Sequence, residues 1–305
     1  MLLLDAVGSS DIGDDILATL EASHCQVAWY NALRWKDVAR YNNRTHRKTL
    51  VVDGAIAYTG GAGIADHWRG DARNEHEWRD VQVRFAGPAA QVLQSGFAMN
   101  WQQTTGELLS GDAYFPSVEP QGPHALQVIL SSAETGASSV QIVHYLAIVC
   151  ARTSLLIANP YFVPDAVAVQ TLIEARQRGV DVQVMVSGIH NDNWLARQNS
   201  VRLYGDLLRA GITILEFDRS MLHQKVMVVD GIWATVGTTN FDNRSFAHNE
   251  ESNVCLYDRT LAGQFERAFR EDARGCTVVT LDAWQRRGVL RRVLEQVAAL
   301  MEDQV

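Results

Sequence analysis

Cysteine and proline are scarce in this chain, and long apolar runs are missing. The 305 residues include four cysteines and six prolines, and no two cysteines form a C-x-x-C pair. A chain of this length can bury a core without disulfides, so we expect reduced thiols as in a cytosolic protein. No run approaches the roughly 18 consecutive apolar residues of a membrane-spanning helix. The opening segment also lacks the basic start and apolar length of a signal peptide, which favours a cytoplasmic globular protein.

Positive charge is also in short supply. Asp and Glu number 35 against 27 Lys and Arg, which gives a net charge of −8. A protein that binds many nucleic-acid phosphates normally carries a basic surface. The acidic balance therefore disfavours nucleic acid as a partner, although it permits a small basic pocket. The chain contains no P-loop, G-x-S-x-G or H-E-x-x-H motif and no carboxylate cluster for two metal ions, so we expect chemistry without a metal or a cofactor.

Short runs rich in Val, Ile and Leu alternate with helical stretches. Gly or Asp bounds most of the runs, which is typical of buried strands. They cover residues 2–4, 26–30, 49–53, 55–59, 126–130, 155–158, 180–186, 212–217, 225–230 and 232–236. Apolar residues at helix spacing, followed by a glycine at the end, predict helices at 165–179 and 201–210. This alternation predicts an α/β fold with layered sheets and helices.

The chain contains an internal repeat. Residues 46–54 read HRKTLVVDG, and residues 223–231, which lie 177 positions later, read HQKVMVVDG. Each copy continues through an apolar strand to a turn of small residues, GGAG at 60–63 and GTTN at 237–240. Duplication of one fold explains this pattern, so we expect two related halves.

Composition divides the chain into four parts. Residues 106–124 are rich in glycine and proline and lack periodicity, which is typical of a linker. This linker separates a first half at 1–105 from a second half at 125–283. The second half has a strand and a helix upstream of the strand that corresponds to the start of the chain. We therefore expect the first half to be incomplete by one strand–helix unit.

The fourth part, residues 284–305, is predicted to be an amphipathic helix. Val289, Leu290, Val293, Leu294 and Val297 lie on one helical face. Arginines gather near the start of the segment. Such a helix can lie on anionic lipid, or it can pack on its own domain or on a second copy of the chain.

Each copy of the repeat carries a histidine and a lysine two residues apart. Alternation along a strand places His46 and Lys48 on one face, and likewise His223 and Lys225. An imidazole can be a nucleophile, an acid or a base near neutral pH, and an ammonium suits phosphate oxygens. Asn240 after the second turn adds an amide donor. Two such sets facing each other predict a phosphodiester site.

The two H-x-K-x4-D motifs, the second followed by G-T-T-N, resemble the signature of the phospholipase D superfamily. The flanks are most similar to its bacterial cardiolipin synthase branch, at residues 43–48, 78–81, 87–89, 159–165 and 237–246. The resemblance covers nearly the whole chain. It implies two duplicated α/β sandwich halves, each a mixed sheet flanked by helices, related by a pseudo-twofold axis. From the cysteines and the lack of a membrane or signal segment we expect a cytoplasmic protein, with peripheral contact to the inner face of the cell membrane through the C-terminal helix as the alternative.

The activity implied by the resemblance is transfer of a phosphatidyl group from a phosphatidylglycerol-like phospholipid to an alcohol, through a phosphohistidine intermediate. It makes His46 the nucleophile and His223 the acid and base. It places an orienting carboxylate beside each imidazole, Asp80 with His46 and Glu251 with His223. The full set of expected site residues, including those that stabilise the phosphate oxygens, is His46, Lys48, Asp80, His223, Lys225, Asn240 and Glu251.

The first motif departs from the family pattern at its turn, where Gly63 stands in place of asparagine. One phosphate donor is therefore absent, and loss of an oxyanion donor slows a reaction roughly 10²–10³-fold, unless backbone N–H groups replace it. Asp53 and Asp230, which end the motifs, are expected to be turn residues. Three alternatives stay open: a phospholipase D that releases phosphatidic acid, a nuclease of the same superfamily, and a degenerate protein without activity. The sequence does not decide the head group or whether water or an alcohol is the acceptor.

Overall fold

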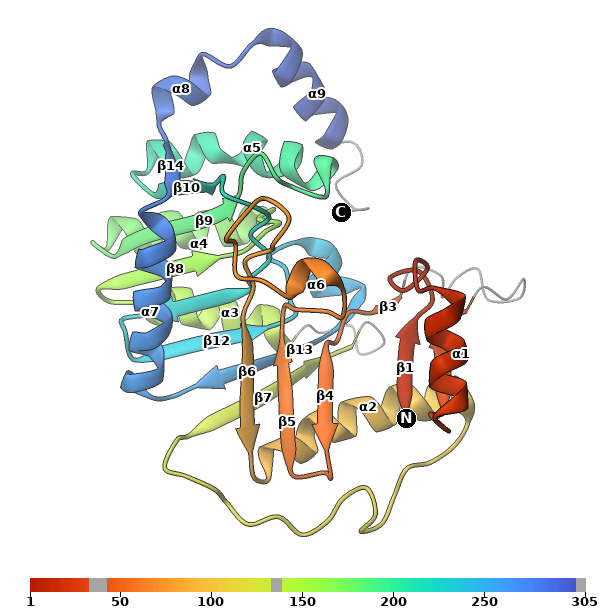
Figure 1. Cartoon of the computed structure of the whole chain (residues 1–305). Helices are drawn as coiled ribbons and strands as arrows, with labels where there is room; N and C mark the ends of the chain where they lie inside the picture. Colours follow the sequence, from red (N-terminus) through yellow and green to blue (C-terminus); the bar gives the residue numbers. More distant parts are fainter. Residues whose placement is uncertain (33–42, 133–138, 300–305) are drawn as a thin grey trace.

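Helices and strands alternate through the computed structural model, which describes residues 1–32, 43–132 and 139–299. Figure 1 shows the second half as a large sheet flanked by helices, with strands of the first half running across it. The first half comprises β1 (Leu2–Asp5), α1 (Asp14–Ala22), β2 (Val27–Tyr30), β3 (Arg44–Thr45), β4 (Thr49–Val52), β5 (Ile56–Gly60), the 3₁₀ helix η2 (Asp66–Trp68), β6 (Gln82–Ala86) and α2 (Ala89–Thr105). The second comprises β7 (Leu126–Ser131), α3 (Ser139–Cys150), β8 (Ser154–Ala158), α4 (Ala166–Gln177), β9 (Asp181–Ser187), α5 (Trp194–Arg209), β10 (Thr213–Phe217), β11 (Val226–Val229), β12 (Trp233–Gly237), α6 (Asn243–Ala247), β13 (Asn249–Leu256), α7 (Arg259–Ala273), β14 (Cys276–Val279), α8 (Leu281–Gln285) and α9 (Val289–Ala299).

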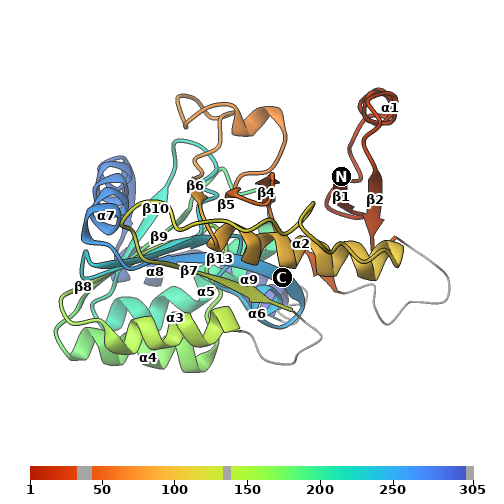
Figure 2. The ribbon, with the colours of Figure 1, turned by 90° about the horizontal axis from the view of Figure 1, so that it is seen from below.

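The main sheet is mixed and belongs almost entirely to the second half. Its strand order is β14-β10-β9-β8-β11-β12-β13-β3, and β7 also pairs with β13. Strands β8, β9 and β10 run parallel to one another, whereas β11, β12 and β13 are antiparallel. Helices α3, α4 and α5 cover one face and α7 covers the other (Figure 2). Because both faces are covered, the central strands β8 and β11 are buried apolar runs.

The first half repeats part of this arrangement. In its antiparallel sheet β4-β5-β6, Thr49 pairs with Thr59, and the same register recurs one repeat later between Val226 and Val236. Strands β1 and β2 pair in parallel, as β9 and β10 do. In the second half β8 connects the parallel pair β9–β10 to the antiparallel pair β11–β12, because it pairs with both β9 and β11. No described strand of the first half takes that place, so this half is split into two small sheets and is incomplete relative to the second.

The two halves share a hydrophobic core. Phe85 of β6 and Leu93 of α2 pack in one buried cluster with Val254 and Leu256 of β13. This apolar contact fixes the position of the first half on the main sheet and brings the ends of β4 and β11 to the same junction.

The ten predicted strands are all present, within one residue of their expected ends. Helix α4 matches its prediction, but α5 begins earlier than residue 201 because the Asn193 side chain caps it by accepting a hydrogen bond from the backbone N–H of Ala196. Residues 106–124 carry no helix or strand, as expected of the predicted linker. In place of a single C-terminal helix there are two, α8 and α9, separated by residues 286–288; residues 300–305 of that prediction lie outside the described residues.

Strand β13 was not predicted, although it is central to the structure. Its sequence, NEESNVCL, contains five polar residues in succession, yet all eight residues are buried. The side chains of Glu250, Glu251 and Ser252 contact residues of the first half, whereas Asn253 bonds threonines of its own half. A search for apolar runs therefore passes over the strand that carries Glu250 and Glu251.

Candidate active site

The two H-x-K segments meet at the junction between the halves, directly before β4 and β11. The expectation that they lie within strands is wrong, because each backbone leaves its own sheet to bond the opposite half. The backbone N–H of His46 donates to the carbonyl of Glu250 at 2.9 Å, and the backbone N–H of His223 donates to the carbonyl of Arg79 at 2.7 Å. These two bonds hold the motifs toward one another.

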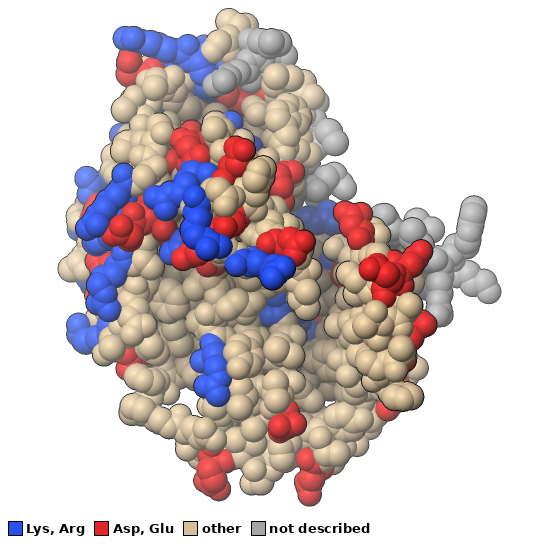
Figure 3. Space-filling view, in the orientation of Figure 1, with Lys and Arg blue, Asp and Glu red and all other residues tan. Residues whose placement is uncertain are grey.

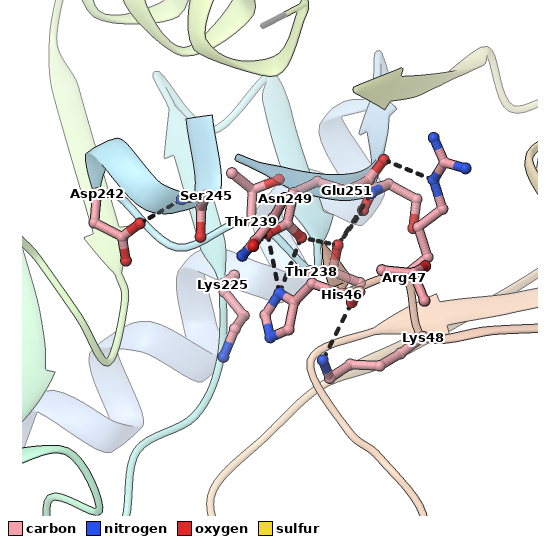
Figure 4. A network of polar contacts seen from close by, with 12 residues as sticks. His46, Arg47, Lys48, Lys225, Thr238, Thr239, Asp242, Ser245, Asn249 and Glu251 are labelled. Atoms are coloured by element: carbon pink, nitrogen blue, oxygen red, sulfur yellow. Dashed lines mark hydrogen bonds and ion pairs between the residues drawn. The ribbon is translucent and has the colours of Figure 1, made fainter. Parts of the chain in front are cut away.

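His46 is paired with a buried carboxylate of the second half. Its Nδ1 lies 3.0 Å from both Oε1 and Oε2 of Glu251, and these side chains form the centre of Figure 4. The hydroxyl of Thr238 donates a short hydrogen bond to Glu251, and the amide of Asn249 donates another at 3.3 Å. Burial alone would raise the pKa of Glu251, but His46, Thr238 and Lys48 hold it below its ordinary value. The ionised carboxylate fixes the proton of His46 on Nδ1 and leaves Nε2 for a substrate.

His223 is paired in the same way with a carboxylate of the first half. Its Nδ1 lies 2.8 Å from Oδ2 of Asp80. Asp80 also accepts hydrogen bonds from the indole N–H of Trp68 at 3.0 Å and from the backbone N–H of Val81 at 2.7 Å. Burial raises the pKa of Asp80 to about 6, although Lys225 opposes the shift. The side chain of His223 is 8% exposed, against 26% for His46.

The carboxylates are therefore crossed between the halves. The expectation that Asp80 orients His46 and Glu251 orients His223 is wrong. The reason lies in the backbone: the residue before each carboxylate accepts the N–H bond of the opposite histidine. The next residue along the chain then faces the imidazole of the other half.

Both lysines join the cluster. Nζ of Lys225 lies 3.0 Å from Nε2 of His223 and 2.7 Å from its carbonyl oxygen, and Nζ of Lys48 lies 3.2 Å from the carbonyl oxygen of His46. Burial lowers the pKa of both ammonium groups, that of Lys225 to about 7. Burial also lowers the pKa of His223, and the charges of Lys225, Lys48 and His46 lower it further. The two lysines and the two histidines therefore interact electrostatically. A phosphate bound among them would favour their positively charged forms.

Trp68 fills the glycine turn of the first half. A Cβ at Gly63 would lie 2.8 Å from Cζ3 of Trp68, and a Cβ at Gly61 would lie 2.3 Å from Oδ1 of Asp80. In the second half Thr238 stands at the position that corresponds to Gly61, and its hydroxyl donates to the carboxylate of that half. In the first half the indole N–H of Trp68 is the donor to Asp80. Trp68 therefore supplies a hydrogen bond that the glycine turn lacks, while it occupies the space where a side chain at residue 63 would lie.

The remaining motif residues divide between the site and the turns. Asn240 follows β12 and is 5% exposed, and its side-chain oxygen has no hydrogen-bond partner among the described residues. Asp53 and Asp230 both adopt φ of +53°, and Asp230 accepts hydrogen bonds from the backbone N–H groups of residues 152–154. The interpretation of these two aspartates as turn residues is confirmed.

The sequence did not predict the buried contacts of Arg47, which follows His46 and which we call the clamp of the first motif. Arg47, the middle residue of the first motif, lies 3.0 Å from Oε2 of Glu250, and both side chains are 6% exposed. Its guanidinium also donates to the carbonyls of Gly96 at 3.1 Å and Ser131 at 2.8 Å, and to the amide oxygen of Asn100. Arg47 thus ties the first motif to α2, β7 and β13. Nothing in the sequence distinguishes this arginine from a solvated one.

The second motif has a corresponding clamp. The amide of Gln224 donates to Oδ2 of Asp272 at 2.9 Å, and Nε of Arg79 donates to the same oxygen at 2.8 Å. Two tryptophans also lie near this motif, with the ring centroids of Trp68 and Trp78 at 5.6 and 5.1 Å from that of His223. The sequence did offer a signal for these rings, since both stand in the short segment between the glycine turn and Asp80.

The C-terminal segment packs on its own half. Helix α9 lies against α5, Ala298 is buried, and Arg287 pairs with the buried carboxylate of Glu295 at 2.7 Å. Val289 and Val297 remain exposed on the other side. Packing on its own domain is therefore confirmed for one face of this helix.

No three His, Cys, Asp or Glu side chains in residues 1–32, 43–132 and 139–299 come together as a metal site. None of the helices in these ranges combines the length and the apolar character needed to cross a bilayer.

Comparison with known proteins gives a consistent result. Residues 146–273 match the protein family described as "Cardiolipin synthase, PLD-like domain". Cardiolipin synthase 2 of Staphylococcus epidermidis is 31% identical over 98% of this chain and 62% of its own length. Cardiolipin synthase of Geobacillus kaustophilus is 32% identical over 98% of this chain and 60% of its own length. The chain therefore spans about three fifths of the length of these curated relatives.

A solved structure shares the fold. Phosphatidylserine synthase of Haemophilus influenzae aligns with a TM-score of 0.61 over 86% of this chain and 70% of its own chain, at 14% sequence identity. This likeness concerns the arrangement of strands and helices. The sequence matches make the chain similar to cardiolipin synthases over nearly its whole length and to their PLD-like domain over residues 146–273, and the structural match adds a likeness of fold.

Proposed function

We propose that the chain is a phosphatidyltransferase that moves a phosphatidyl group from a phosphatidylglycerol-like lipid to an alcohol through a phosphohistidine intermediate. The observation that carries the proposal is the junction cluster, in which two histidine–carboxylate pairs lie with the half-buried Lys48 and the buried Lys225. The pairs are His46 with Glu251 and His223 with Asp80. The relatives named cardiolipin synthase support a phospholipid as the substrate class.

The chemistry needs two imidazoles in different protonation states. One neutral imidazole attacks phosphorus, while the other donates a proton to the departing alkoxide. The second imidazole then accepts the proton of the incoming alcohol as that alcohol attacks the phosphohistidine. Each carboxylate holds its imidazole in one tautomer and stabilises the positive charge that forms during the reaction. In this mechanism Lys48, Lys225 and Asn240 would contact the phosphate oxygens, and an oxyanion donor of this kind contributes roughly 10²–10³-fold to a rate.

Hydrolysis to phosphatidic acid would use the same residues with water as the acceptor, so the acceptor is decided by assay. A nuclease is disfavoured by the charge of the chain. The net charge is −8, and on the face in Figure 3 basic and acidic side chains are intermingled across the middle of the molecule. A protein that grips many backbone phosphates instead presents a broad basic surface.

We also propose that the C-terminal segment contacts the membrane that holds the substrate. Val289 is 75% and Val297 50% exposed on α9, which packs against α5, and Arg286 and Arg292 of the same segment are exposed as well. Apolar side chains flanked by arginines bind anionic bilayers. Sedimentation with phosphatidylglycerol vesicles tests this contact: Val289→Asp/Val297→Asp should reduce binding, and unchanged binding contradicts it.

The experiment for the enzymatic proposal uses the full chain and vesicles of labelled phosphatidylglycerol, with and without added glycerol. We expect a labelled phosphatidyl-transfer product, and its loss in the double variant His46→Ala/His223→Ala. His124→Ala provides the matched control, because His124 is exposed and pairs only with Asp258 on the surface. Phosphatidic acid as the sole product would assign hydrolysis instead. No product from any phospholipid, with a folded protein, would refute the proposal.

A further inference from the structure

The two histidines of the cluster are not equivalent. Nζ of Lys225 approaches Nε2 of His223 to 3.0 Å, whereas Lys48 bonds the backbone carbonyl of its own histidine, His46, at 3.2 Å. Within the described part of the chain, no hydrogen bond joins Lys48 to the ring of His46. One imidazole therefore has an ammonium directly on its Nε2, and the other does not.

This contact determines which ring nitrogen of His223 carries the proton. When Lys225 is protonated, its ammonium group donates hydrogen bonds and cannot accept them, so Nε2 of His223 then carries the lone pair. Its proton then lies on Nδ1, which donates to Asp80 at 2.8 Å. An imidazole with its lone pair on Nε2 can attack phosphorus once Lys225 turns its hydrogen bond to a phosphate oxygen. A second proton on Nε2 would be placed against the charge of Lys225.

His46 has the opposite environment. Nδ1 lies 3.0 Å from both oxygens of Glu251, whose pKa is held below its ordinary value and which therefore stays ionised. Burial lowers the pKa of His46 below its ordinary value, although the charge of Glu251 opposes this shift. The partner of His223 is weaker, since burial raises the pKa of Asp80 to about 6. An imidazolium is thus better stabilised at His46 than at His223.

Access to the site agrees with this difference. The side chain of His46 is 26% exposed and that of His223 is 8% exposed. The acid and base must reach the departing and incoming alcohols, which exchange with solvent. The nucleophile stays on phosphorus through both steps and needs no such exchange.

On these grounds we propose that His223 is the nucleophile and His46 the general acid and base, the reverse of the assignment that family resemblance implies. The assignment rests on the proposed function. In the first step the Nε2–P bond to His223 forms, the bond from phosphorus to the head-group oxygen breaks, and the alkoxide takes the Nε2 proton of His46. In the second step the incoming alcohol gives its proton to Nε2 of His46 and bonds phosphorus, and the Nε2–P bond returns its electron pair to His223.

The test uses a phosphatidyl ester of p-nitrophenol, whose leaving group needs no general acid, and maps phosphohistidine by mass spectrometry after rapid quenching. His46→Ala should still form the adduct on His223. Its turnover of phosphatidylglycerol should fall about 10²–10⁴-fold, the usual contribution of a general acid, while release of p-nitrophenol in the first step should change less than about tenfold. His223→Ala should form no adduct. The control His124→Ala should behave as the wild type.

If a variant fails to fold, the wild-type chain still tests the assignment, because the position of its phosphohistidine can be mapped directly. An adduct on His46, in the wild type or in His223→Ala, would overturn the assignment and leave the proposed function standing. Turnover by the wild type without any adduct on His223 would overturn it as well. Absence of both adduct and turnover in the folded wild type would refute the proposed function itself.

Discussion

Replacing Gly63 by alanine will destabilise the protein, because the ring of Trp68 fills the space beside this glycine. The new Cβ would lie 2.8, 2.9 and 3.4 Å from three atoms of the six-membered ring. The ring cannot move freely, since its N–H is bonded to Asp80 at 3.0 Å and His67 packs on it with ring centroids 4.1 Å apart. Forcing extra volume into such a site costs about 1–3 kcal/mol. At about 2 °C per kcal/mol for a chain of this size, Tm should fall by roughly 2–6 °C.

Urea unfolding of a double-mutant cycle isolates this contact. In the Trp68→Ala background the same Gly63→Ala change should cost less than about 0.5 kcal/mol, because the atoms that clash are gone. Gly263→Ala is the matched control: it lies inside α7, its Cβ would meet nothing closer than 3.6 Å, and it should stabilise the helix by about 0.5–1 kcal/mol. Equal costs of Gly63→Ala in both backgrounds would refute the reasoning. By the same geometry Gly63→Asn alone should not raise activity, since the ring occupies the space where the amide would lie.

Three further predictions concern the cluster and its clamp. Asp80→Asn should shift the imidazole ¹⁵N signals of His223 more than those of His46, and Glu251→Gln should do the reverse; the opposite pattern would contradict the crossed pairing. Because Asp80 must be ionised and its pKa is about 6, while Lys225 must be protonated and its pKa is about 7, kcat/KM should fall below about pH 6 and above about pH 7. Lys225→Arg, which stays protonated, should move the alkaline limb of any residual activity to higher pH, and an unmoved limb would exclude Lys225 as its source. Arg47→Leu should cost about 3–5 kcal/mol in urea unfolding because it leaves Glu250 buried without its partner, whereas Arg274→Leu, from a pair with 77% and 69% exposure, should cost less than about 1 kcal/mol.

Local pattern was sufficient for ten of the described strands and for the identity of most residues of the candidate site. Buried runs such as those of β8 and β11 are continuous in the sequence, so their ends could be predicted to within one residue. The two motifs likewise named His46, Lys48, His223 and Lys225. These features are local, and each can be recognised without knowing what lies across the junction.

The partners of these residues depend on long-range packing. Which carboxylate faces which imidazole is set by backbone bonds between the halves, and neither motif contains that information. Strand β13 is polar because it lies in the junction, so its burial cannot be inferred from hydropathy. The compensation of the glycine turn by Trp68 also follows from a loop that folds back on the turn.

The crossed carboxylates have a consequence for how such a chain could arise. In a twofold dimer of identical chains, a contact from residue i to residue j is matched by one from j to i. His46 with Glu251 and His223 with Asp80 reproduce that form within one chain. A single-repeat ancestor with these contacts would have been active only as a dimer, in which each copy completed the imidazole of the other. Within one chain the two copies can differ, as Trp68 on one side and Thr238 on the other illustrate, yet a change at Asp80 still acts on a histidine 143 residues away.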